Sequence, residues 1–282
     1  FQRYSGYVAN RSGRPETVFY DSVNVVMNNQ HFRSRPISPS ILNEIEQNKL
    51  YSIFNERFSD ASDFTFVFTG MIDENYFLPL VQKYLGNLPN IDRKENWKDV
   101  GKLFPKGEIK KAIFKGLDPK SMVQIRFSGD FDWSRKNRFQ IRVLSQAFRI
   151  KLREILREEM GGTYGVWTWA SPEQYPRERY QFGIGFGCAP ENVKSMISAV
   201  YTQIDSLKQF GLDESYLYKV KESIRMEKQK NLKENKYWLN AISTKDQYNE
   251  DFMEILNSED LISNITSNDL IHLSNLYLDK KN

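Results

Sequence analysis

Cysteine and histidine are scarce in this sequence of 282 residues, which has one cysteine and two histidines. The single cysteine, Cys188, excludes a disulfide framework within the chain. A helical zinc-peptidase motif needs two imidazoles one turn apart, so that both face one metal ion. His31 and His272 lie near opposite ends of the chain, which excludes that motif. A structural Cys/His zinc site is unsupported as well, and we predict no metal in this chain.

Long apolar runs and a strong excess of one charge are also absent. No run approaches the roughly 20 apolar residues that span a bilayer, and the first residues show no signal-peptide pattern. Forty basic and 36 acidic side chains leave a formal charge of +4, which is too small and too evenly scattered for a nucleic-acid footprint. We therefore predict no membrane insertion and no nucleic-acid binding, and we expect the charged stretch 219–236 to be a solvated helix face.

Motifs for nucleophilic and nucleotide chemistry are missing too. The sequence has no Gly-x-Ser-x-Gly elbow and no phosphate-binding loop. Gly183, Gly185 and Gly187 alternate within a predicted strand and do not open a helix, which argues against a dinucleotide site. Cys188 directly follows this strand. We expect its thiol to be a small buried hydrophobe, because free cysteine usually is.

Apolar residues make up 40% of the sequence, which is enough for a sizeable core. The length favours two globular units. The polar stretch 89–107 interrupts the apolar pattern and predicts a linker, which divides the chain into domains 1–100 and 101–282. Because the sequence starts without an initiator methionine, we expect a piece of a longer protein, with the first domain incomplete.

Both domains are predicted to combine helices with strands, which gives an α+β fold class. In the first, the patterns predict a helix over 41–58, an aromatic strand over 64–68 and a helix that Asp73 caps and Gly86 ends. In the second, they predict a mostly antiparallel sheet with helices packed on it. Its strands are expected at 122–127, 163–170 and 180–187, and its helices at 134–159, 193–207 and from 213 to 236.

One pair of residues suggests chemistry. Arg157 ends a predicted helix and Tyr164 begins a predicted strand, with Gly161 and Gly162 between them. A chain reversal through two glycines can bring a guanidinium beside a phenol, one holding a peptide carbonyl and the other donating to a developing oxyanion. Alternatively, Arg157 complements the negative end of its helix and Tyr164 is an ordinary strand residue. Physics alone leaves both interpretations open.

The segment 156–166 reads Leu-Arg-Glu-Glu-Met-Gly-Gly-Thr-Tyr-Gly-Val. It resembles the arginine/tyrosine signature of the insulinase/pitrilysin family of zinc metallopeptidases, the inverzincins. The resemblance implies a clamshell of two halves, each with two related insulinase-type α/β sandwich domains. This chain is similar to the C-terminal, non-zinc half of the long bacterial pitrilysin-like members. Further stretches that resemble the family lie at 66–73, 83–89, 182–191 and 236–239.

The resemblance implies a zinc-dependent endopeptidase that hydrolyses peptides inside a closed chamber. The zinc would be bound by an N-terminal zinc-binding half or by a separate zinc-bearing subunit. Carried over by position, Tyr164 would hydrogen-bond the scissile carbonyl and the oxyanion, and Arg157 would orient Tyr164 or the substrate backbone. The isolated chain would be inactive, because it lacks the zinc motif. Similarity to the bacterial members implies a periplasmic location.

The alternative function is a catalytically inactive insulinase-like scaffold or partner subunit, since the same architecture occurs in family members that have lost catalysis. The presence of both Arg157 and Tyr164 argues against it, because a scaffold has no need for an oxyanion donor. A basic nucleic-acid-binding domain is a third interpretation. It rests only on the isoelectric point and the lysine-rich helix.

Overall fold

The computed structural model describes residues 2–163 and 165–279. The described residues form two compact units, and each is discontinuous in sequence. The first unit comprises 2–10, Ile37–Lys98 and Met226–Ser258, and the second comprises Arg11–Pro36, Asp99–Arg225 and 259–279. The expected division of the chain at residue 100 stays a prediction.

The second unit contains a three-stranded antiparallel sheet, as the sequence predicts. Its strands are β1 (Ser121–Asp130), β2 (Val166–Glu173) and β3 (Arg179–Cys188), in the order β1-β3-β2. Alternation decides which side chains are buried, because successive residues of a strand point to opposite faces. The buried apolar residues of β1 therefore lie directly opposite those of β3, in the pairs Val123↔Phe186, Ile125↔Ile184 and Phe127↔Phe182.

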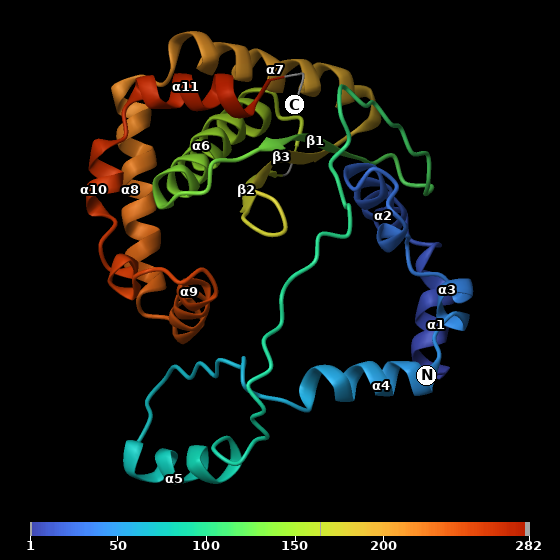
Figure 1. Cartoon of the computed structure of the whole chain (residues 1–282). Coiled ribbons are helices and arrows are strands. Elements are labelled where there is room, and N and C mark those ends of the chain that lie inside the picture. Colours follow the sequence, from blue (N-terminus) through green and yellow to red (C-terminus); the bar gives the residue numbers. More distant parts are fainter. Residues whose placement is uncertain (1, 164, 280–282) are drawn as a thin grey trace. The chain divides into compact units, whose positions relative to one another are not determined.

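Helices cover the apolar face of this sheet (Figure 1). Helix α6 (Arg135–Arg153) packs across β2, and α11 (Ser267–Tyr277) lies beside α7 (Val193–Phe210) and contacts α6. Ser134 caps α6 by accepting a hydrogen bond from the Asn137 N–H at 3.1 Å. Gly211, with a φ of 70°, ends α7. The core includes Leu144, Phe148, Leu152, Val200, Ile204, Leu270 and Leu273.

Smaller helices complete the second unit. They are α2 (Pro15–Met27), α10 (Glu259–Asn264), a six-residue π-helical segment after α6 (Glu154–Glu159) and two short 3₁₀ turns (Phe32–Ser34 and Pro190–Asn192). Helix α8 (Glu214–Asn231) begins in this unit and ends in the first.

The predicted helix from 213 to 236 is two helices. Helix α8 stops at Asn231, and α9 (Asn235–Gln247) starts afresh. The reason is a turn in which the Lys233 and Glu234 N–H groups donate to carbonyls three residues back, which breaks the α-helical pattern of four.

Helices are the only regular elements among the described residues of the first unit, which differs from the prediction at two places. The expected helix over 41–58 is divided into α3 (Pro39–Asn43) and α4 (Gln47–Phe58). The predicted strand over 64–68 is wrong, because none of the described residues pairs with it and a strand needs a hydrogen-bonded neighbour. Asp73 does cap α5 (Glu74–Tyr84), accepting from the Asn75 N–H at 3.0 Å. The unit also holds α1 (Gln2–Arg11), α9 and a 3₁₀ turn (Phe252–Ile255).

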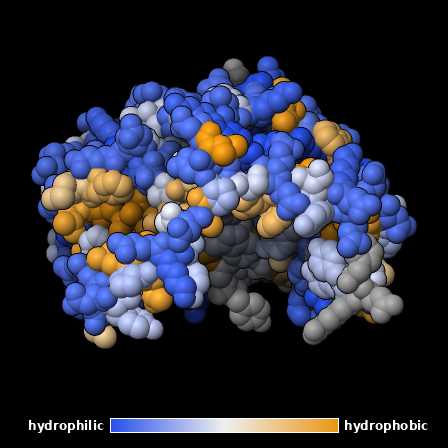
Figure 2. Space-filling model, turned by 60° about the horizontal axis from the view of Figure 1, so that its bottom comes forward, coloured by the Kyte–Doolittle hydropathy of each residue, from blue (hydrophilic) through white to orange (hydrophobic). Residues whose placement is uncertain are grey.

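Several large apolar side chains of the first unit are exposed. Phe66 and Phe68 in the unpaired segment are 46% and 49% exposed, and Leu50, Phe54 and Phe58 of α4 are also exposed. Figure 2 shows apolar residues gathered in patches on an otherwise largely hydrophilic face. Within the described part of the chain, no helix is both long and apolar enough to cross a membrane.

Candidate functional site

Arg157 lies in the π-helical segment that continues α6. Its neighbour Leu156 is fully buried in the core, whereas Arg157 itself is exposed. The wider turn shows in the hydrogen bond from the Met160 N–H to the Ile155 carbonyl, which spans five residues. Such π-helical turns often occur at functional sites. The core therefore anchors this helix end while its guanidinium faces outward.

The glycine pair reverses the chain after this helix end. Gly161 has a φ of 59°, a left-handed conformation that favours glycine. The Gly162 N–H donates to the Leu156 carbonyl at 3.1 Å, which closes the reversal. A Cβ on Gly162 would lie 2.9 Å from the Met196 sulfur, so the bend also needs a residue without a side chain where it meets α7.

Tyr164, the second predicted site residue, lies outside the described residues. The structure does describe its neighbours. Thr163 is buried, and its hydroxyl donates to the Gly165 carbonyl at 3.0 Å and accepts from the Gly165 N–H at 3.2 Å. This local hydrogen bonding keeps Thr163 out of the ladder, and β2 begins at Val166, later than the predicted 163. Whether Arg157 and Tyr164 meet therefore stays a prediction.

The surroundings of Arg157 carry both charges. Glu154 accepts a hydrogen bond from the Tyr216 hydroxyl, and Lys151 and Lys219 each lie 4.6 Å from the centre of the Tyr216 ring. Glu158 is 3.8 Å from Arg153. Across 2–163 and 165–279, the Arg157 side chain makes neither a hydrogen bond nor an ion pair with a described residue. Its guanidinium is therefore available to a ligand as far as these residues are concerned.

The other face of the sheet carries a feature that the sequence analysis missed. Trp169 and Trp167 of β2 lie over Gly183 and Gly185 of β3, so closely that a Cβ on Gly183 would be 1.9 Å from the Trp169 ring. The alternating glycines thus make room for two indoles. The sequence did contain a signal for this packing. Two tryptophans two residues apart in one predicted strand are followed, in the next predicted strand, by glycines with the same spacing.

Of the remaining candidates, Cys188 and His31 have structural roles. Cys188 is buried, and this burial raises the pKa of its thiol, which makes it a poor nucleophile. The His31 Nδ1 accepts from the Arg33 N–H, so its Nε2 donates to the Val100 carbonyl at 3.1 Å. His272 is exposed. No group of three or more His, Cys, Asp or Glu side chains within the described ranges could hold a metal ion, so these residues do not fit a zinc site.

The antiparallel sheet with helices over one face defines an α+β domain. The family profile described as "Peptidase M16 inactive domain" matches residues 44–224. The chain belongs to this family. This confirms two predictions from the sequence, namely that the chain is an insulinase/pitrilysin-type domain and that its fold class is α+β.

Individual relatives agree with this assignment. The chain is 26% identical over 175 residues to "Probable zinc protease PqqL" of Haemophilus influenzae. The aligned region covers 62% of this chain and 18% of that protein. The crystal structure of the periplasmic protease PqqL from Escherichia coli superposes with a TM-score of 0.74 at 17% identity, over 95% of this chain and 30% of that one.

A third relative is a crystal structure of a peptidase M16 inactive domain from Pseudomonas fluorescens. It superposes with a TM-score of 0.75 at 14% identity, over 99% of this chain and 66% of that one. At these identities the solved structures show the fold alone. The chain spans only part of these relatives: about a fifth of the length of the Haemophilus protein and under a third of the Escherichia chain.

Proposed function

We propose that this chain is the C-terminal, non-zinc half of a zinc-dependent endopeptidase that hydrolyses peptides inside a closed chamber. The observation that carries the proposal is the exposed Arg157 at an anchored helix end, directly before the glycine bend. The similarity to a protein named as a zinc protease supports the reaction class. The likeness to a periplasmic protease supports a periplasmic location.

In this proposal Tyr164 donates a hydrogen bond to the scissile carbonyl and to the oxyanion that forms from it. Arg157 holds the substrate backbone or orients Tyr164. Donors aimed at a developing oxyanion stabilise the transition state more than the ground state.

The zinc belongs to a partner, in the proposed function, because the described donors of this chain do not fit a zinc ion. That partner is either an N-terminal half of the same protein or a separate subunit. The isolated chain is then inactive, since it provides substrate contacts without the group that activates water.

The test is reconstitution of the chain with the zinc-bearing half, followed by cleavage of an internally quenched peptide. Tyr164→Phe removes only the donor, and we expect turnover to fall by about 10²–10³. Arg157→Gln should lower turnover as well. Arg153→Gln is the matched control, because Arg153 is also exposed on this helix end and its side chain makes, among the described residues, only the long contact with Glu158. Unchanged turnover of Tyr164→Phe removes Tyr164 from the mechanism.

A catalytically inactive scaffold or partner subunit is the competing function. It predicts that the reconstituted assembly cleaves no peptide and that Tyr164→Phe changes nothing measurable. The two functions differ in what they predict for the sequence upstream of residue 1 and for the neighbouring genes. An inverted His-x-x-Glu-His motif in either place favours the endopeptidase. Absence of that motif from both favours the scaffold.

A further inference from the structure

The sheet face that carries the two indoles also carries an unusual arginine. On this face lie Gln124 and Arg126 of β1, Gln181 of β3 and Trp167 and Trp169 of β2, all half-buried. They point away from the core, because Val123, Ile125 and Phe127 between them point into it. The face therefore combines two indoles, two amides and one cation.

Arg126 is held by neutral groups. Its guanidinium lies 5.0 Å from the centre of the Trp169 ring. Its Nε donates to the Gln124 side-chain carbonyl at 3.0 Å, and its Nη1 donates to that of Gln181 at 3.3 Å. Burial lowers the pKa of Arg126, and Tyr20 of α2 acts weakly in the other direction. The group still stays protonated, because an arginine pKa is too high to bring into the physiological range.

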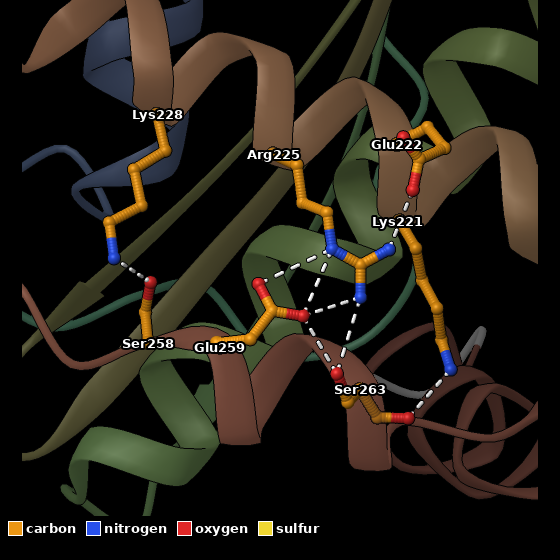
Figure 3. A network of polar contacts seen from close by, with 7 residues as sticks. All are labelled: Lys221, Glu222, Arg225, Lys228, Ser258, Glu259 and Ser263. Carbon is orange, nitrogen blue, oxygen red and sulfur yellow. Dashed lines mark hydrogen bonds and ion pairs between the residues drawn. The ribbon is translucent and has the colours of Figure 1, made fainter.

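No carboxylate within the described ranges pairs with Arg126. Three other partly buried arginines of the second unit have acid partners. Arg179 pairs with Glu173 at 2.7 Å and Arg11 pairs with Asp21 at 2.7 Å. Arg225 pairs with Glu222 at 2.6 Å and with Glu259 at 2.5 Å, and it lies between the two carboxylates (Figure 3). Burying a cation partly without a counter-ion costs free energy. A ligand that brings an anion to Arg126 would remove this cost.

We propose that this sheet face, which we call the Arg126 face, binds a carboxylate-bearing segment of the peptide substrate. The inference rests on the proposed function and names a substrate preference for it. The free Nη donors of Arg126 take the carboxylate, since guanidinium and carboxylate match in geometry. Trp167 and Trp169 cover apolar parts of the peptide, and the Gln124 and Gln181 amides are positioned to bind its backbone.

A nucleic acid is the other ligand that pairs phosphate with guanidinium and bases with indoles. The Arg126 face fits it less well. Single-stranded nucleic acids need a row of cations along the backbone, whereas Arg126 is the single unpaired cation on this face within the described residues and Arg179 nearby is neutralised by Glu173. One cation between amides suits one or two carboxylates.

The test measures equilibrium binding to the 282-residue chain by fluorescence anisotropy. The probes are a fluorescein-labelled peptide that alternates glutamate with leucine and the same peptide with glutamine for glutamate. We expect the glutamate peptide to bind about tenfold more tightly, a difference of about 1.4 kcal/mol. Arg126→Gln should abolish this preference, and Arg126→Lys should keep part of it. Circular dichroism checks that each variant is folded.

Lys194→Gln is the matched control, because Lys194 is an exposed cation on α7, away from this face. The proposal is overturned if both peptides bind equally, if neither binds, or if Lys194→Gln loses as much preference as Arg126→Gln. It is also overturned if an oligothymidine displaces the peptide more effectively than unlabelled peptide does. That last result assigns the face to nucleic acid.

Binding without turnover separates this inference from the proposed function. If Tyr164→Phe leaves turnover of the reconstituted enzyme unchanged while Arg126→Gln abolishes the preference, the function fails and the Arg126 face stands. If Tyr164→Phe lowers turnover while Arg126→Gln keeps the preference, the proposed function stands and the inference about the Arg126 face fails.

Discussion

The contact between Trp169 and Gly183 allows a quantitative test of the sheet. In Gly183→Ala the new methyl group would lie 1.9 Å from the Trp169 ring, about 1.6 Å closer than ordinary carbon contacts of roughly 3.5 Å. The indole must therefore swing away and lose its place over β3 and beside Arg126. Overpacking of this kind costs about 1–3 kcal/mol of unfolding free energy. Urea denaturation followed by tryptophan fluorescence measures it.

Two controls isolate the clash from the general effect of replacing glycine. A Cβ on Gly187, in the same strand, would be 3.7 Å from its nearest neighbour, the Ser121 carbonyl oxygen. Gly187→Ala should therefore stabilise the protein by up to about 1 kcal/mol, because alanine loses less backbone entropy on folding. In a Trp169→Ala background the ring is gone, and Gly183→Ala should have the same effect as Gly187→Ala. Equal effects at 183 and 187, or a cost that persists without Trp169, would refute the reasoning.

Two further predictions concern buried polar groups. Tyr180→Phe removes the hydrogen bond from the buried Tyr180 hydroxyl to the Tyr277 carbonyl, 2.9 Å long, and should cost about 1–3 kcal/mol in urea denaturation. Hydrogen bonds, first from the Ser62 hydroxyl and then from the backbone N–H groups of Ile91, Ser62 and Arg93, lower the pKa of Asp60 from 3.8 to about 2. This contribution to stability is complete above pH 4 and is lost as pH falls toward 2. Thermal denaturation should show that loss in the wild type and less of it in Asp60→Asn.

The periodic parts of the fold could be predicted from the sequence. The apolar positions of α6 and the alternation in β1 each depend on one element facing one core, and these elements form near the predicted residues. The segment 64–68 could not, because its aromatic residues favour a strand locally whereas a strand exists only with a paired neighbour. The break near Ile45, between α3 and α4, could not be predicted either, because the residues on both sides of it favour a helix.

The candidate site was only partly predictable. Arg157 was identified from its motif, but the sequence did not show that it lies in a π-helical turn, beside the buried Leu156 and with its own side chain exposed. Nothing in the residue types specifies that turn. The Arg126 face was missed because each member is unremarkable alone, and its character comes from the register that sets Arg126 opposite Gly183 and Trp169 opposite the same glycine.

That register links stability and proposed binding within one strand. Thr168 of β2 faces the core and donates to the Ser145 carbonyl of α6 at 2.7 Å, while Trp167 and Trp169 on either side face outward. A slip of one residue would turn Thr168 outward and both indoles into the helix layer. The glycines of β3 oppose this slip, because only the observed register places Gly183 and Gly185 beneath the two rings. The same glycines that fix the pairing of β2 therefore also hold the indoles beside Arg126.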